Sequence, residues 1–130
     1  MASITQTIDF DVFSVSYRDD DIYVVEVKED KEFTIANMVE LFSGLKRFGG
    51  KRLPVLVLCK YLASTTTEFM NYLAQEDSNP YSLADAFVLS SFNQKLMANF
   101  YMKIIRPKRP TRFFTSEEEA SKWLHNLKYE

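Results

Sequence analysis

The stretch "LPVLVLCK" (residues 53–60) is almost continuously apolar. Such a run is typical of a strand that is covered on both faces, as the central strands of parallel sheets are. Its proline, Pro54, stands at the start of the run, where a missing backbone N–H does least harm to strand pairing. The stretch therefore predicts the central strand of a sheet, and the segments on either side are interpreted around it.

The segment before this strand contains two strand patterns and one helix pattern. In "IDFDVFSVSY" (8–17) apolar and polar residues alternate, which is the period of a half-buried strand. The run "IYVVEVK" (22–28) is rich in β-branched and aromatic residues, and the acidic stretch between the two runs predicts a hairpin turn. Apolar residues from 33 to 48 follow helical spacing, and Gly49 and Gly50 predict the end of that helix.

The segment after the central strand alternates between helices and strands. Helical spacing predicts helices over 65–75 and 92–105 and a last helix that packs Trp123 against the sheet, whereas "ADAFVLS" (84–90) and "TRFFT" (111–115) predict strands. Strands that alternate with helices usually lie parallel to one another. We therefore predict one α/β domain over the whole chain, with an opening β-hairpin, a mixed and mostly parallel sheet of five strands, and four α-helices.

Two of the predicted helices begin with a recognisable cap. Thr65 and Glu68 have the spacing of a capping box, in which each side chain binds the other residue's free backbone N–H. Ser116 and Glu119 have the same spacing before the last helix. Both pairs support the predicted helix boundaries.

Composition excludes several classes of function. The 130 residues include 16 basic and 18 acidic side chains, so the net charge of −2 does not favour nucleic acid or an anionic membrane as a partner. No segment has the length of a membrane span and the amino terminus lacks a signal-peptide pattern, so we expect a soluble, cytoplasmic protein. A single cysteine, Cys59, and a single histidine, His125, provide neither a disulfide nor a metal cluster, and with only three glycines there is no phosphate-binding loop. We expect no metal, no cofactor and no catalytic residues.

The order of elements resembles a known family. "ADAFVLSS…LMANFYMKIIRPKRPTRFFTSEEEASKWL" (84–124) is similar to the closing half of SpoIIAA-like proteins in the broader STAS group, and the opening hairpin and central strand fit the same pattern. The resemblance implies a SpoIIAA/STAS-like sandwich and a non-enzymatic interaction module that is switched by serine phosphorylation. It also implies a relation in fold to the lipid-binding CRAL-TRIO domains. The family's Asp-Ser-Ser-Gly type of signature is absent, and "ASTTTEF" (63–69) stands in its place.

Ser64, Thr65 and Thr66 are therefore candidate phosphate acceptors. They lie at the start of a predicted helix, where free backbone N–H groups and the positive end of the helix dipole favour an anion. Capping of the helix explains the same residues without any modification.

The basic stretch at residues 103–112, between the third predicted helix and the last predicted strand, has two interpretations. Its cations follow a helix end and the glutamates after it begin the next helix, which is the arrangement that helix dipoles favour. Alternatively, arginines held by Pro107 and Pro110 form an anion site, because a guanidinium binds carboxylate or phosphate through two parallel hydrogen bonds. The candidate anion contacts are Arg106, Arg109 and Arg112. Under the first interpretation, replacement of all three by glutamine leaves the fold intact.

The helices at 65–75 and 92–105 carry more apolar side chains than one buried stripe needs. The surplus belongs to the core, lines an apolar pocket, or forms a contact between two copies of the chain. The residues of this candidate apolar surface are Phe69, Met70, Phe92, Met97, Phe100 and Tyr101.

These observations leave two functions open. The first is a non-enzymatic regulatory or protein-interaction module with an unidentified protein partner, either as a monomer or as a homodimer. The alternative is a carrier or sensor of an apolar small molecule or lipid. An enclosed apolar cavity between the helices at 65–75 and 92–105 would favour the alternative.

Overall fold

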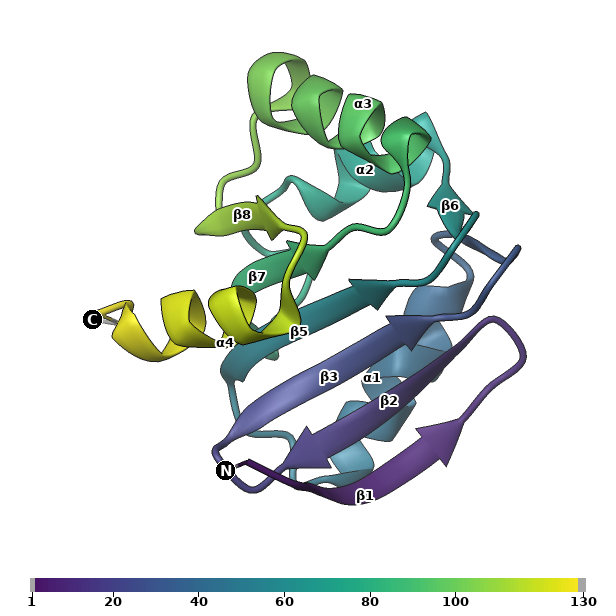
Figure 1. The fold of residues 1–130 in the computed structure, drawn as a ribbon. Coiled ribbons are helices and arrows are strands. Elements are labelled where there is room, and N and C mark those ends of the chain that lie inside the picture. The colour runs from purple at the N-terminus through teal and green to yellow at the C-terminus, as the bar shows by residue number, and fades with distance from the viewer. Residues whose placement is uncertain (1, 129–130) are drawn as a thin grey trace.

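The computed structural model describes residues 2–128 (Figure 1). Over this range, no helix has the length and apolar character that crossing a membrane requires. The elements follow one another in the order β1 (Ile4–Asp9), β2 (Phe13–Arg18), β3 (Ile22–Val27), β4 (Glu32–Phe33), α1 (Asn37–Arg47), β5 (Leu53–Cys59), β6 (Ser64–Thr65), α2 (Thr67–Leu73), β7 (Ser82–Val88), α3 (Phe92–Phe100), η1 (Tyr101–Ile105), β8 (Thr111–Phe114) and α4 (Glu117–Asn126).

Six of the strands form one mixed sheet in the order β1-β2-β3-β5-β7-β8. Strands β1, β2 and β3 pair in antiparallel fashion, whereas β3, β5, β7 and β8 pair in parallel. The prediction for "LPVLVLCK" is confirmed, because β5 pairs with β3 on one side and with β7 on the other. The chain is thus an α/β protein with a mostly parallel mixed sheet and four α-helices.

The prediction of five strands is wrong, because an additional edge strand, β1, precedes β2 and shares only its last two residues with the run at 8–17. The backbone N–H of Phe10 donates a 2.8 Å hydrogen bond to the carbonyl of Phe13, which turns the chain between β1 and β2. Strand β1 lies at the sheet edge with mostly exposed side chains, so it lacks the apolar alternation that reveals a half-buried strand. The strands β4 and β6 pair over two residues in a separate sheet, which the sequence pattern also does not predict.

The first helix is shorter than predicted. It begins at Asn37 and not at Phe33, because Phe33 is buried in β4 and its backbone pairs with β6. Its end agrees with the prediction. Gly49 and Gly50 have φ angles of 106° and 67°, in the left-handed region that glycine adopts at little cost.

Helices cover the two faces of the sheet unequally. The first face packs against α1 and α2 in one apolar core, and Tyr101, the first residue of η1, contacts Phe113 of β8 on the same face. On the other face α4 buries Ala120 and Leu124 against strands β5 and β7. The ring of the partly buried Trp123 packs beside that of Phe114, with 5.9 Å between the two ring centroids. Figure 1 shows α4 on the opposite side of the sheet from α1.

The third helix continues beyond α3 as the five-residue π-helix η1. It starts at the predicted place, where the hydroxyl of Ser91 accepts a hydrogen bond from the backbone N–H of Gln94. It ends at Arg106, whose φ of 63° and N–H bond to the carbonyl of Tyr101 close the π turn before Pro107. The basic stretch then leads into β8 and α4. It therefore connects the end of one helix to the start of the next, as predicted.

Candidate ligand pocket

A pocket of about 240 Å³ lies between α2, α3 and the first face of the sheet. For comparison, an engineered apolar cavity of about 150 Å³ binds benzene. The pocket therefore has room for an organic molecule larger than one aromatic ring. Its lining is predominantly apolar and includes Val25, Val55, Val57, Leu73, Phe87 and Met97.

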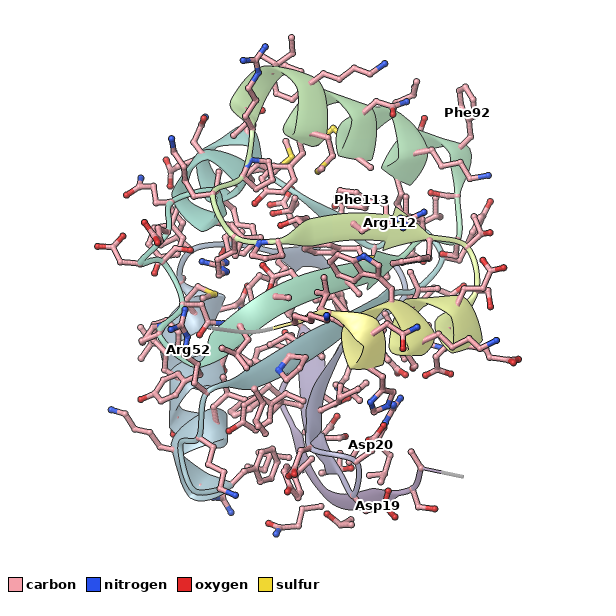
Figure 2. The ribbon with its side chains drawn as sticks, turned by 90° about the vertical axis from the view of Figure 1, so that its left-hand side faces the viewer. Asp19, Asp20, Arg52, Phe92, Arg112 and Phe113 are labelled. Atoms are coloured by element: carbon pink, nitrogen blue, oxygen red, sulfur yellow. The ribbon has the colours of Figure 1, made fainter. Side chains whose placement is uncertain are left out.

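The predicted apolar surface is divided between this pocket and the outside of the molecule. Phe69, Met70, Met97 and Tyr101 line the pocket. Phe92 does not, and Figure 2 shows it projecting outward at the start of α3. Phe100 likewise lies on the outer side of α3 and is exposed. The sequence prediction identified the right helices but did not separate their two faces.

Tyr101 brings a polar group to the apolar pocket. Its side chain is 3% exposed, and no other group among residues 2–128 hydrogen-bonds to its hydroxyl. Burial, together with the nearby negative charge of Asp85, raises the pKa of this hydroxyl. The group therefore stays protonated and able to donate a hydrogen bond across the physiological pH range.

Asp85, which also lines the pocket, forms a buried ion pair with Arg109. Arg109 Nη2 donates to Asp85 Oδ2 at 3.0 Å, and Ser82 Oγ donates to Asp85 Oδ1 at 2.7 Å. Arg109 Nη1 donates to Ser78 Oγ at 2.9 Å and to two backbone carbonyls of the loop after α2. The charge of Asp85 is thus balanced and both of its oxygens are bonded, as buried charges require.

Gln94 fixes the position of α3 beside the pocket. Its side-chain Nε2 donates to the carbonyls of Lys60 at 2.8 Å and Ala63 at 2.9 Å, in the loop after β5. Its Oε1 accepts a 2.7 Å hydrogen bond from the backbone N–H of Ser90. The two bonds from Nε2 join the first turn of α3 to a segment about thirty residues earlier, and the side chain is buried.

The three candidate anion contacts do not form one site. Arg106 donates from Nε to the carbonyl of Lys103 at 3.2 Å, and the exposed Arg112 guanidinium lies 5.3 Å from the ring centroid of Phe114. Arg109 is buried, with its guanidinium bound to protein oxygens. The structure argues against the expectation that glutamine is tolerated at all three positions, because replacement of Arg109 would leave the carboxylate of Asp85 buried without its cation.

The cap of α2 lies one residue later than predicted. Thr66 and not Thr65 accepts the hydrogen bond from the backbone N–H of Phe69, at 3.0 Å. Thr65 belongs to β6 and its hydroxyl donates to the carbonyl of Phe33 at 2.5 Å. Of the three candidate phosphate acceptors, only Ser64 is exposed. Phosphorylation at this position stays a prediction.

Cys59 and His125 lie in different environments. Cys59 lines the pocket at the end of β5, and burial raises the pKa of its thiol to about 12. His125 is an exposed residue of α4, with Nε2 2.7 Å from Asp20 Oδ2. It is not among the residues that line the pocket. The two residues therefore do not form a cysteine–histidine pair.

The sequence interpretation missed Asp85 and Gln94 as site residues and assigned Arg109 a different role. One signal was present: Asp85 is a charged residue inside the otherwise apolar strand "ADAFVLS". A carboxylate in a buried strand needs a buried cation, and Arg109 in the next connection was a candidate. No local pattern marks Gln94, because its partners follow a different strand.

Neither a curated protein nor a solved structure matches this chain. A family model, described as a domain of unknown function (DUF7793), matches residues 16–128. That range runs from β2 to α4 and includes all the pocket-lining residues. The chain therefore belongs to the DUF7793 family.

Proposed function

We propose that this protein is a non-enzymatic binding module that holds a small, mainly apolar molecule between its sheet and helices α2 and α3. The observation that carries the proposal is the pocket of about 240 Å³, which is predominantly apolar and contains a few polar groups at defined positions. Ligand pockets in proteins have this composition. A carrier or sensor of a small molecule therefore fits the geometry better than a module whose only function is contact with another protein.

The chemistry of the pocket supports binding without catalysis. The thiol of Cys59 has a pKa of about 12, so it is almost entirely protonated at neutral pH and is a poor nucleophile. The pocket lining contains no lysine, arginine or histidine. Its one carboxylate, Asp85, is held by Arg109 and Ser82, so it is not free to act as a base.

Self-association is a second candidate property, and the outer side of α3 and η1 favours it. Phe92 and Ile104 are 72% and 68% exposed, and Leu96, Phe100 and Met102 are also exposed there. We propose that a second copy of the chain covers this face, which forms a homodimer. Since the inner side of α3 lines the pocket, a ligand that moves this helix would also change the contact.

We also propose that the chain is related to SpoIIAA-like proteins. This relation would make Ser64 the site of a regulatory phosphate. Supporting features are the strand–helix order and the exposure of Ser64 beside the start of α2. Mass spectrometry of peptides from the protein isolated from its own cells tests this point. Phosphate on Ser64 supports it, whereas full coverage of the peptide without phosphate contradicts it.

Binding of an uncharged fluorescent naphthalene, N-phenyl-1-naphthylamine, tests the main proposal. We expect saturable fluorescence enhancement with the folded protein. Ala98→Leu, which adds bulk to the pocket wall on α3, should weaken binding about tenfold or more, because an added side chain occupies the volume that the ligand needs.

Asn99→Leu is the matched control. It introduces the same side chain one position along α3, where the native residue is exposed and does not line the pocket. We expect this variant to bind the fluorophore as the natural protein does. No binding by the natural protein, or equal losses in both variants with unchanged melting curves, would contradict the proposal.

A further inference from the structure

The polar groups of the pocket define the chemistry of its ligand more narrowly than its apolar walls do. A buried hydroxyl without a hydrogen-bond partner is unfavourable, so native proteins rarely keep one without a reason. Tyr101 has such a hydroxyl and lines the pocket. A second buried donor without a partner, Nε of Arg109, belongs to the ion pair at the same end of the pocket.

The backbone around Tyr101 is also unusual. Tyr101 is the first residue of the π-helix η1, and its carbonyl accepts a hydrogen bond from the N–H of Arg106 at 2.8 Å. Single π turns are rare, are less regular than α-helix, and occur often at functional sites. The turn ends at Arg106 in a left-handed conformation, which is unfavourable for a residue other than glycine, so the position of Tyr101 is specified by an irregular backbone.

Charge restricts the ligand further. The only charged side chain in the pocket lining is Asp85, which already forms a neutral pair with Arg109. An anionic ligand would meet this carboxylate and no lysine, arginine or histidine of the pocket lining, and a cationic ligand would compete with Arg109 for it. Transfer of an unpaired charge into such surroundings is strongly unfavourable.

From these observations we propose that the pocket recognises an uncharged molecule whose apolar body fills the space under α2 and α3 and whose oxygen atom accepts a hydrogen bond from the hydroxyl of Tyr101. Ketones, aldehydes, esters and ethers share this chemistry. The proposal rests on the proposed function and adds a specificity-determining residue and a ligand class to it.

The test uses 2-acetylnaphthalene and 2-ethylnaphthalene, which differ by a carbonyl group in place of a methylene group. Each ligand displaces N-phenyl-1-naphthylamine from the natural protein and from Tyr101→Phe, which removes only the hydroxyl. We expect Tyr101→Phe to weaken binding of the ketone about two- to tenfold, the value of one hydrogen bond, and to leave binding of the hydrocarbon unchanged. Naphthalene-2-carboxylate should bind at least about tenfold more weakly than the ketone.

Tyr72→Phe is the matched control, because the hydroxyl of Tyr72 donates to the carbonyl of Ser78 at 2.8 Å and Tyr72 does not line the pocket. This variant should keep the preference for the ketone but melt at a lower temperature. Tyr101→Phe should melt at the same temperature or higher, since it removes a hydroxyl without a protein partner.

An unchanged ratio of ketone to hydrocarbon affinity in Tyr101→Phe would overturn this inference and leave the proposed function intact. Tighter binding of the carboxylate than of the ketone, or displacement of the fluorophore by neither neutral ligand, would also overturn it. Failure of the natural protein to bind the fluorophore itself would count against the proposed function instead.

Discussion

Arg109 Nη2 lies 3.0 Å from Asp85 Oδ2, and the two side chains are 4% and 6% exposed. This ion pair joins the connection before β8 to the buried strand β7 at one end of the pocket. Arg109 is thus a structural element of the core, although it belongs to a basic stretch that looks solvent-exposed.

Arg109→Gln should therefore destabilise the protein by about 3–5 kcal/mol, because it leaves a buried carboxylate without its cation. Arg106→Gln and Arg112→Gln are matched controls in exposed positions and should each change stability by at most about 1 kcal/mol. Urea denaturation of the three single variants measures the difference. Three equal, small effects would show that the Arg109 pair does not stabilise the fold.

Asp20→Asn should lower stability at neutral pH. The hydrogen bonds from Arg18, at 2.6 and 2.8 Å, are the largest cause that lowers the pKa of Asp20, and His125 contributes as well. A carboxyl whose folded-state pKa is lowered stabilises the protein above the unfolded pKa of about 4, and this stabilisation is lost as pH falls through the folded pKa. We expect a loss of about 1–3 kcal/mol at pH 7 that disappears at strongly acidic pH.

The neighbouring Asp19→Asn is the control for this measurement. Asp19 is exposed and accepts one hydrogen bond, from the backbone N–H of Ser3. The two residues lie together near the β2–β3 turn in Figure 2. Denaturation curves from pH 2 to 7 should diverge between the two variants only in the upper part of this range, and a constant difference would refute the assignment to the Asp20 carboxylate.

The thiol of Cys59 should react slowly with a thiol reagent in the folded protein. Its pKa of about 12 leaves roughly a thousandfold less thiolate at pH 8 than an ordinary exposed cysteine has. The rate should keep rising with pH through 8–10 without a plateau, whereas the protein unfolded in urea should reach a plateau near pH 9. A plateau near pH 9 in the folded protein would mean that the thiol is not buried at the pocket wall.

Light scattering at high micromolar concentration should give the mass of a dimer. Because Phe92 and Ile104 are among the most exposed apolar side chains of the described chain, Phe92→Ser combined with Ile104→Ser should yield a monomer. Val39→Ser on α1 is the control, since Val39 is 74% exposed on a different helix and should not affect the mass. A monomeric natural protein would remove the proposal of a homodimer.

Gly44→Ala should destabilise the protein although alanine favours helix more than glycine does. A Cβ atom at Gly44 would lie 2.7 Å from Cγ1 of the fully buried Val15, so α1 or β2 would have to move. The net loss should be about 1–3 kcal/mol, the usual cost of overpacking a core. The exposed neighbour Ser43→Ala should be neutral or slightly stabilising, and thermal melting distinguishes the two.

Much of the fold could be predicted from local sequence because periodicity and caps act over a few residues. The apolar run of β5 predicted its central place, and Ser116 caps α4 as expected, with its hydroxyl accepting from the N–H of Glu119 at 3.3 Å. Gly49 and Gly50 end α1 for the same reason, since the left-handed backbone they adopt is a property of the residue itself. These features needed no knowledge of distant contacts.

Tertiary structure decided the environment of individual side chains. Arg109 and Arg106 belong to the same basic stretch, and only the position of Asp85, 24 residues earlier, makes one of them buried and leaves the other exposed. The same holds for two neighbours on one helix: Tyr101 faces the pocket, whereas Phe100 faces the solvent. A local pattern encodes which element forms, whereas the partner of a side chain depends on which distant segments the sheet brings beside it, and burial then sets the energy of each charge and hydroxyl.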